Sequence, residues 1–300
     1  MSLAIRHSDE RETVSTALSW AAGFLAENGI DESRLNAELL LASALGLPRT
    51  RLLLDRGQEI TAVQLRIYRE LIKRRVVREP LQYITGETEF MGLDLKVNRS
   101  VLVPRPETEL LVEHALEFLK HRHRTACAVV DVGTGSGNIA IAIAKSIPWS
   151  SVTALDVSPE ALDVASANAR MHGLTNVKFL QRDLFAERWL AGRFDLVVAN
   201  LPYIAATEFE LLEPEVRAHE PEIALTDRKD GLEGIRRLAD VAPTVMAPRG
   251  EILLEIGYDQ EKSVKEILTC AGFVGIDVHR DLAGHPRVVC GRLTQDGAAP

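Results

Sequence analysis

The feature that most constrains the fold of this sequence is the stretch CAVVDVGTGSGNIAIAIAKSI, residues 127–147. A short apolar run, typical of a buried strand, leads into a glycine-rich turn and then into an apolar run of helical length. The order of strand and helix continues through SVTALDVS, PEALDVASANARMHG, NVKFLQRDL, FDLVVAN and GEILLEIG. Strands that alternate with helices predict a mostly parallel sheet that is covered on both faces.

The last two predicted strands constrain the edge of that sheet. FVGIDVHRD, residues 273–281, and PRVVCGRL, residues 286–293, are separated only by LAGH. A parallel crossover needs about a dozen residues or more, so these two strands must pair antiparallel. The sequence therefore predicts an α/β fold with a Rossmann-like, mostly parallel sheet and an antiparallel edge strand.

The first 80 residues have a different pattern, with apolar residues at helical spacing and no strand signal. Thr61 and Gln64 have the spacing of a capping box ahead of LRIYRELIKRRVVRE. We expect a small N-terminal helical bundle over residues 1–80 that recognises the substrate. Alternation and glycines over residues 81–104 indicate a β-hairpin linker, and residues 105–300 would form the catalytic domain.

Six basic residues crowd the end of this predicted bundle: Arg66, Arg69, Lys73, Arg74, Arg75 and Arg78. A run of charges is usually a solvated helix face. The same residues would also suit a contact surface for an acidic partner, or for ribosomal or transfer RNA. The sequence leaves both interpretations open.

Composition excludes some classes of function and weakens others. The 300 residues carry a net charge of −8, which counts mildly against a protein that mainly grips nucleic acid, because phosphate neutralisation dominates that affinity. The three cysteines lie far apart and the histidines lack metal-ligand spacing, so we expect no disulfide framework and no metal site. No signal segment and no membrane-spanning stretch is evident, and we expect a cytoplasmic protein.

The glycine-rich turn indicates which ligand it accepts. Gly133, Gly135 and Gly137 allow the backbone to turn sharply and approach a ligand closely. A dinucleotide fingerprint would need glycine or alanine where Asn138 stands. A phosphate-binding loop would need a Lys-Ser/Thr ending that is missing here. Asp131 would repel a diphosphate but could orient an ammonium group, which favours S-adenosylmethionine.

Further acidic residues follow the next two strands. Asp156 ends the second strand, where a carboxylate can accept hydrogen bonds from ribose hydroxyls. Asp183 follows the third strand and could reach the adenine amino group, with Leu184 and Phe185 lining the ring. Ligands of open α/β sheets collect at the carboxyl ends of the strands. We therefore predict a cofactor site there.

The fourth strand ends on the tetrapeptide Asn200-Leu201-Pro202-Tyr203, beside the same edge. The nitrogen of a planar amide or aromatic amine is a poor nucleophile and must be held in line with the methyl group. The Asn200 side-chain oxygen and the backbone carbonyl of Leu201 can accept both N–H hydrogens. Pro202 would fix the turn and Tyr203 would pack on the flat group. Most of the expected rate gain is positioning.

These motifs resemble the protein-(glutamine-N5) methyltransferases that modify peptide-chain release factors, the PrmC or HemK family. The resemblance covers nearly the whole chain: the helical N-terminal region, VPRPETE at 103–109, DVGTGSGNIA at 131–140, the tetrapeptide, EPEIALTDRKDGL at 220–232 and DLAGHPRVVCGR. It implies a class I fold that transfers methyl from S-adenosylmethionine to the glutamine amide of a Gly-Gly-Gln motif, leaving S-adenosylhomocysteine. The residues expected to contact the cofactor are Asp131, Val132, Gly133, Thr134, Gly135, Gly137, Asp156, Asp183, Leu184, Phe185 and Asn200. The tetrapeptide would contact the glutamine.

One position departs from the family pattern, which is Asn-Pro-Pro-Tyr. Leu201 stands where the first proline belongs, so the φ rigidity of proline is lost while the backbone carbonyl remains. We expect activity to be retained. We also expect the segment 204–232 to cover the substrate.

Alternative functions stay open at this stage. Methyltransferases that act on a glutamine of a ribosomal protein, or on adenine N6 of a nucleic acid, use the same amide-holding chemistry. A nicotinamide-dependent oxidoreductase and a non-catalytic binder with a decayed site are more distant possibilities.

Overall fold

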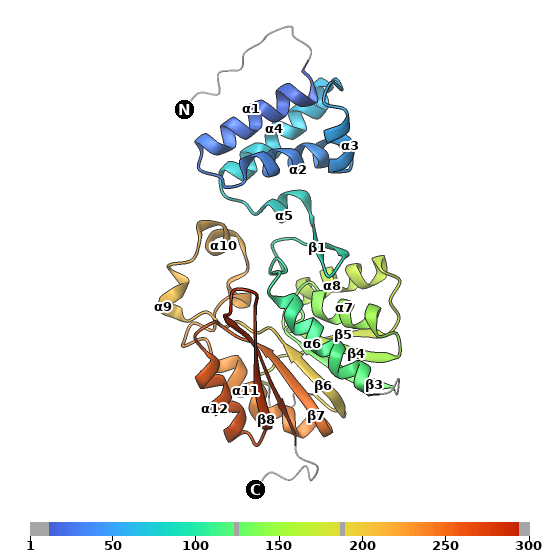
Figure 1. Ribbon diagram of the computed structural model, residues 1–300, viewed down its shortest axis with the longest axis vertical. Helices are drawn as coiled ribbons and strands as arrows, with labels where there is room; N and C mark the ends of the chain where they lie inside the picture. Colours follow the sequence, from blue (N-terminus) through green and yellow to red (C-terminus); the bar gives the residue numbers. More distant parts are fainter. Residues whose placement is uncertain (1–11, 123–125, 187–189, 294–300) are drawn as a thin grey trace. The chain divides into compact units, whose positions relative to one another are not determined.

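A computed structural model describes residues 12–122, 126–186 and 190–293. The chain forms two compact units, Met1–Gly86 and Glu87–Pro300 (Figure 1). Residues 1–11, where the predicted bundle begins and where a signal segment would lie, are outside the described residues. Within the described ranges, no helix is both long enough and apolar enough to cross a membrane.

The N-terminal unit is helical. Its helices are α1 (Val14–Glu27), α2 (Ser33–Leu45), α3 (Arg49–Leu54), α4 (Ala62–Val76) and α5 (Leu81–Thr85). Apolar side chains from α1, α2 and α4 form its core, and the Tyr68 hydroxyl in that core donates to the Ala37 carbonyl at 3.0 Å. Thr61 and Gln64 form the reciprocal capping box at the start of α4. This agreement arises because caps and helical spacing are local signals.

Residues 81–104 differ from the expected hairpin linker. Leu81–Thr85 is a short helix that ends at Gly86, whose φ of +81° is left-handed. Only β1 (Glu87–Phe90) and β2 (Leu93–Lys96) form the antiparallel hairpin, and this hairpin belongs to the second compact unit. Tyr83 and Ile84 of this helix are buried, and Gly86 supplies the left-handed residue that commonly ends a helix.

The second unit is built on a seven-stranded sheet in the order β5-β4-β3-β6-β7-β9-β8. Its strands are β3 (Cys127–Val132), β4 (Ser150–Asp156), β5 (Val177–Gln181), β6 (Phe194–Ala199), β7 (Met246–Glu255), β8 (Val274–Arg280) and β9 (Pro286–Arg292). The pairs from β5 to β7 are parallel, and β9 is antiparallel to both β7 and β8. The predicted sheet is thus confirmed.

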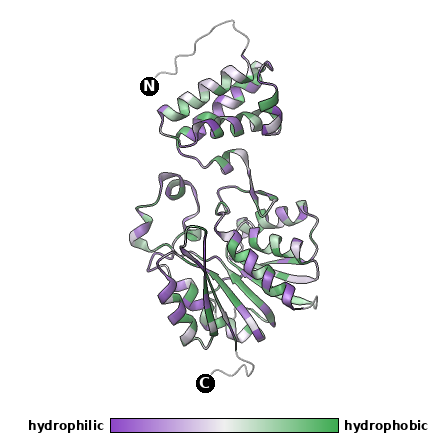
Figure 2. Ribbon diagram, in the orientation of Figure 1, coloured by the Kyte–Doolittle hydropathy of each residue, from purple (hydrophilic) through white to green (hydrophobic). Residues whose placement is uncertain are grey.

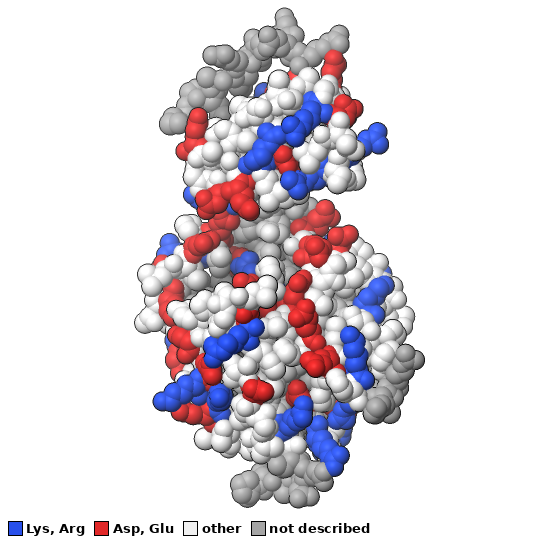
Figure 3. Space-filling model, viewed as in Figure 1, with Lys and Arg blue, Asp and Glu red and all other residues white. Residues whose placement is uncertain are grey.

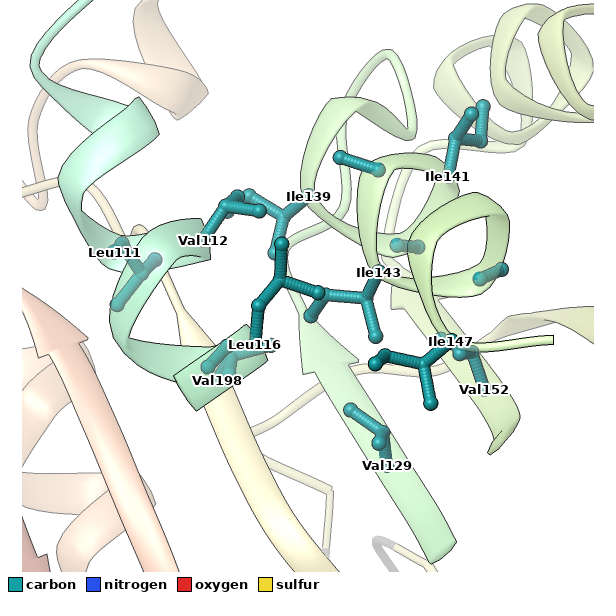
Figure 4. Close-up of a cluster of buried hydrophobic side chains, with 14 of the residues drawn as sticks. Leu111, Val112, Leu116, Val129, Ile139, Ile141, Ile143, Ile147, Val152 and Val198 are labelled. Atoms are coloured by element: carbon teal, nitrogen blue, oxygen red, sulfur yellow. The ribbon is translucent and has the colours of Figure 1, made fainter. Parts of the chain in front are cut away.

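Alternation along the central strands divides the core into two layers. Val129 of β3 and Val198 of β6 face one layer, whereas Val130 and Val197 face the other. Helices α6 (Thr108–His121), α7 (Asn138–Ser146) and α8 (Pro159–Met171) cover the first layer, which Figure 4 shows in close-up. Such doubly buried strands carry apolar residues at nearly every position, as the hydropathy colouring of Figure 2 shows.

The second layer is covered by α11 (Glu233–Val245) and α12 (Glu261–Cys270). Helix α11 was not predicted, because Gly234 near its start and Pro243 inside it are usual helix breakers. The segment ahead of it carries only short elements. These are α9 (Ala206–Phe209), α10 (Pro214–His219) and a 3₁₀ turn at Glu222–Ala224.

Two residues of the predicted basic cluster, Arg74 and Arg75, make polar contacts inside the N-terminal unit. Lysine and arginine side chains do gather on the viewed face of this unit (Figure 3). Arg75, however, is buried and donates to Asn36 Oδ1 at 2.7 Å and to the Glu79 carbonyl at 3.0 Å. Arg74 pairs with Glu79 at 2.8 Å. These two arginines therefore stabilise the bundle, while Arg66 and Lys73 stay on its surface.

Candidate active site

A cavity of about 380 Å³ opens at the carboxyl ends of β3, β4 and β6. Parallel strands end there together, and the loops that follow them face the same space. Of the predicted site residues, these line it: Val132, Gly133, Thr134, Gly135, Asp156, Asp183, Leu184, Phe185, Asn200, Leu201 and Pro202. Asp131, Gly137 and Tyr203 are not among its lining residues.

The glycine turn is held against the second strand of the sheet. The backbone N–H groups of Gly133 and Thr134 donate to the Leu155 carbonyl at 2.9 and 2.8 Å. Gly133, Gly135 and Gly137 have φ values of +77°, +53° and +83°, which side chains disfavour. The three glycines therefore let the chain turn tightly in front of the cavity.

Gly137 differs from the other two in what surrounds it. A Cβ there would lie 2.9 Å from Ile141 Cδ1 and 3.1 Å from Ala165 Cβ. This glycine thus allows α7 to pack closely on α8. Gly137 is not among the residues that line the cavity, and its contact with the cofactor stays a prediction.

Asp131 is fully buried behind the turn rather than exposed to the cavity. Its Oδ2 accepts from the Thr134 hydroxyl at 2.6 Å. Burial outweighs that hydrogen bond and raises the pKa of Asp131 to about 7. The expected contact with a ligand ammonium group stays a prediction, and the contact observed is one that shapes the turn.

Asp156 lines the cavity, and backbone groups hold its carboxylate in place. Oδ2 accepts from the Gly135 N–H at 2.8 Å, and Oδ1 accepts from the Ser158 N–H at 3.0 Å. A carboxylate has about four lone-pair sites, so both oxygens keep capacity for the two hydroxyls of a ribose.

Asp183, Leu184 and Phe185 form the adjacent wall of the cavity. The Phe185 N–H donates to Asp183 Oδ1 at 2.8 Å, which fixes the turn after β5. Phe185 is 54% exposed. Its ring and the Leu184 side chain together offer an apolar surface to a planar ligand.

The tetrapeptide follows β6 at the other side of the cavity. The Asn200 side-chain amide donates from Nδ2 to Thr108 Oγ1 at 3.2 Å. Leu201 is buried, and its side chain packs against Gly133 and Gly234. Leucine thus fills a space between two glycines in place of the family's proline.

Tyr203 is held by its backbone and by its hydroxyl. Its carbonyl accepts from Gln260 Nε2 at 2.9 Å, and its hydroxyl lies 3.5 Å from Glu255 Oε1. A Cβ on Gly231 would lie 2.1 Å from the Tyr203 carbonyl oxygen, so only glycine fits there. Packing of its ring on a substrate amide stays a prediction.

Residues of two further segments line the cavity, although none of them was named as a site residue. Val101, Pro104 and Arg105 line it from one side and Pro221 from the other. Between them, Glu220 accepts from Arg105 Nη2 at 2.6 Å and from the Val103 N–H at 3.2 Å. Glu220 therefore ties the segment after β2 to the segment before α11. Both motifs were noted in the sequence, and the segment 204–232 was expected to cover the substrate, but the ion pair between Arg105 and Glu220 was not predicted.

The described residues also show whether the protein has a ligand set for a metal ion. Among the described residues, no group of three or more histidine, cysteine, aspartate or glutamate side chains is placed to hold a metal ion.

Comparison with known proteins places the chain in a family. The PrmC N-terminal domain matches residues 16–86, and a methyltransferase domain matches residues 123–269. The chain is 42% identical over 281 residues to the release factor glutamine methyltransferase of Geobacter sulfurreducens, covering 94% of this chain and 97% of that protein. It is 40% identical over 288 residues to that of Bacillus subtilis, covering 93% and 96%. The chain belongs to the release factor glutamine methyltransferase family.

Family membership confirms the resemblance seen in the sequence and makes the chain a methyltransferase. The nicotinamide-dependent oxidoreductase is thereby excluded. A methyltransferase from Pyrococcus furiosus shares the fold, with a TM-score of 0.50 and 19% identity over 76% of this chain and 98% of that one. The two family domains correspond to the helical unit and the sheet unit of the structure.

Proposed function

We propose that this protein transfers a methyl group from S-adenosylmethionine to the side-chain amide nitrogen of the glutamine in the Gly-Gly-Gln motif of peptide-chain release factors. The observation that carries the proposal is the meeting of Asp156, Phe185 and Asn200 on one cavity. Relatives that are about 40% identical over nearly their full length are named release factor glutamine methyltransferases, which supports the proposal.

The cavity fits the proposed methyl donor. Asp156 keeps lone pairs for ribose hydroxyls, and Asp183 and Phe185 line the same cavity, where they would contact the nucleoside base. S-adenosylmethionine carries no phosphate, so these carboxylates would not repel it as they would a diphosphate. When bound, it supplies a methyl carbon activated by a sulfonium.

Asn200 and Leu201 would hold the glutamine. The lone pair of an amide nitrogen is delocalised, so its attack depends on orientation. An N–H group donating to Asn200 Oδ1 and another donating to the Leu201 carbonyl would fix the nitrogen. As positive charge develops there, both hydrogen bonds strengthen. Positioning of this kind lowers a barrier by several kcal/mol, and the product nitrogen can release its proton to water.

The segment 204–232 and the N-terminal unit would serve the protein substrate. Pro221 and Ile223 line the cavity, and Ile223 is largely exposed, which suits a segment that covers a bound peptide.

The exposed residues Arg66 and Lys73 are proposed to contact an acidic surface of the partner. Arg66→Glu with Lys73→Glu should then raise KM for the release factor about tenfold and leave kcat unchanged.

The decisive experiment is incubation with labelled S-adenosylmethionine and a purified release factor, beside a Gln→Ala release factor altered in its Gly-Gly-Gln motif. Label on the first protein alone supports the proposal. Label on both proteins, or only on a ribosomal protein or on adenine of added nucleic acid, would overturn the substrate assignment. Absence of label on every substrate would indicate the non-catalytic binder.

A further inference from the structure

One face of helix α8 lies against the glycine turn. Ala161, Ala165 and Asn168 are spaced at i, i+4 and i+7, which places them on the same side of the helix. All three are buried. Ala161 lines the cavity, and a Cβ on Gly137 would lie 3.1 Å from Ala165 Cβ. The turn is therefore packed on α8, and the next residue on that face is polar.

That residue, Asn168, is fully buried, and its amide makes three hydrogen bonds to the backbone. Oδ1 accepts from the Lys96 N–H at 2.7 Å. Nδ2 donates to the Lys96 carbonyl at 3.0 Å and to the Ser136 carbonyl at 2.9 Å. A primary amide offers both an acceptor and two N–H donors, so asparagine matches all three backbone groups, which neither an aspartate nor a leucine could do.

The two segments that Asn168 joins lead to different parts of the cavity wall. Ser136 belongs to the glycine turn and lines the cavity itself. Lys96 ends β2, and Ser100 and Val101, which follow soon after it in the chain, line the cavity as well. Asn168 is not among the lining residues. Its influence on the cavity must therefore pass through the backbone groups that it holds.

The glycine turn needs such contacts to keep one shape. Its three glycines have φ values between +53° and +83°, and glycine loses more conformational freedom on ordering than any other residue. N–H groups in the first half of the turn donate to the Leu155 carbonyl and to Asp156 Oδ2. Asn168 holds the second half through the Ser136 carbonyl, and the same amide fixes the end of β2.

We propose that Asn168 is a positioning residue that holds the glycine turn and the segment after β2 in the arrangement that binds the methyl donor. The identity of that ligand, S-adenosylmethionine, rests on the proposed function. Without the amide, the two segments move independently, and a smaller fraction of the protein has a cavity ready to bind. The apparent dissociation constant rises by the factor by which that fraction falls.

The first test is Asn168→Leu, which keeps a branched side chain and removes all three hydrogen bonds. The Kd for S-adenosylmethionine, measured by calorimetry on the folded fraction, should rise about tenfold. With S-adenosylmethionine saturating, kcat and KM for the release factor should stay within about twofold of wild type. A residue that only stabilised the fold would lower the folded fraction and leave this Kd unchanged.

The matched control is Asn176→Leu. Asn176 Nδ2 also donates to two backbone carbonyls, those of Ala144 at 3.1 Å and Ser150 at 3.2 Å. Neither partner lines the cavity. This variant should lose stability as well, but it should keep the Kd within about twofold of wild type. Equal Kd values for Asn168→Leu and Asn176→Leu would overturn the proposal.

A second test uses wild type alone, so it does not depend on whether a variant folds. The Lys96 N–H donates to Asn168, whereas the Gly92 N–H of the same hairpin donates to Glu89 Oε1 at 2.7 Å. Adding S-adenosylmethionine should slow hydrogen exchange about fivefold at Lys96 and in the glycine turn, and leave Gly92 unchanged. Slower exchange in the turn without any change at Lys96 would contradict the proposal.

The outcomes also separate this proposal from the proposed function. If wild type binds S-adenosylmethionine, Asn168→Leu binds it about tenfold more weakly and no release factor is labelled, the role of Asn168 stands and the proposed methyl acceptor is refuted. If a release factor is labelled and Asn168→Leu binds the ligand as tightly as wild type, the function stands and the role of Asn168 is refuted. A wild-type protein that binds no S-adenosylmethionine would refute both.

Discussion

Glu38 in the N-terminal unit and Glu255 beside the cavity are both buried carboxylates, but their pKa values move in opposite directions. Burial raises the pKa of Glu38, yet hydrogen bonds and charge from Arg34 and Arg49 outweigh it and leave the pKa lowered. Both arginines lie 2.8 Å from the carboxylate. At Glu255 burial dominates, and the pKa rises to about 7.

The difference separates two uses of buried charge. A paired carboxylate stays ionised and supports the fold, because removing either partner leaves the other uncompensated. A carboxylate that lacks such pairing destabilises the fold whenever it ionises, and groups of this kind cluster at functional sites. The bundle therefore uses its buried acid for structure, and the catalytic unit keeps Glu255 at a cost to stability.

The largest expected effect is that of Glu255→Gln on how the free energy of unfolding depends on pH. The folded pKa of Glu255, about 7, lies above the ordinary value of 4.5, so the unfolding free energy that it contributes falls as pH rises between those values. Relative to wild type, Glu255→Gln should gain about 3 kcal/mol between pH 4.5 and pH 8. Urea unfolding at several pH values measures this difference, and a difference that stays constant with pH would break the comparison.

A smaller effect of opposite sign is expected at Glu38. Glu38→Gln removes the partner of two arginines and should cost about 2 kcal/mol at pH 7. Because the folded pKa of Glu38 is lowered, this contribution is lost as pH falls below the ordinary value. The same urea series measures it, and a cost that grows toward low pH would contradict the assigned pairing.

Glu220 tests whether pairing or location decides the outcome. Glu220 is buried near the cavity, as Glu255 is. Unlike Glu255, it forms an ion pair with an arginine, Arg105, as Glu38 does with Arg34 and Arg49. We expect Glu220→Gln to lose about 1 kcal/mol at pH 8, whereas Glu255→Gln gains stability there. Equal behaviour of the two variants in thermal unfolding at pH 8 would show that location matters more than pairing.

The smallest effect is expected where no charge or side-chain hydrogen bond changes. Leu201→Pro keeps the carbonyl proposed to hold the glutamine and restores the family's residue. The rate of methyl transfer should change by less than about threefold, since both residues are apolar and fit a turn. Methyl-transfer assays of the two proteins measure this, and revival of an inactive wild type by proline would show that leucine is not tolerated.

Local signals explain what the sequence predicted correctly. The capping box of Thr61 and Gln64, the doubly buried strands and the glycine turn all rest on neighbours within a few residues. The antiparallel edge followed from the length of one loop. The cavity position followed from the rule that parallel strands end together.

What the sequence did not reveal depends on contacts between distant residues. Glu255 is the last residue of the apolar strand β7, and only the fold buries it and brings the Tyr203 hydroxyl to its carboxylate. The full burial of Asp131 and its contact with Thr134 were also not predicted, and its expected contact with a ligand stays a prediction. Helix α11 contains a glycine and a proline, which both have low helix propensity. The burial of Ile235 and Leu238 against the sheet outweighs this low propensity.

The central claim is that the Asn200 side chain holds the reacting amide in line with the methyl group. The most direct measurement is the single-turnover rate of methyl transfer by Asn200→Ala, with S-adenosylmethionine and release factor both saturating. We predict a fall of about 10³-fold, while the unfolding free energy stays within about 1 kcal/mol of wild type. A single-turnover rate equal to that of wild type would contradict the claim.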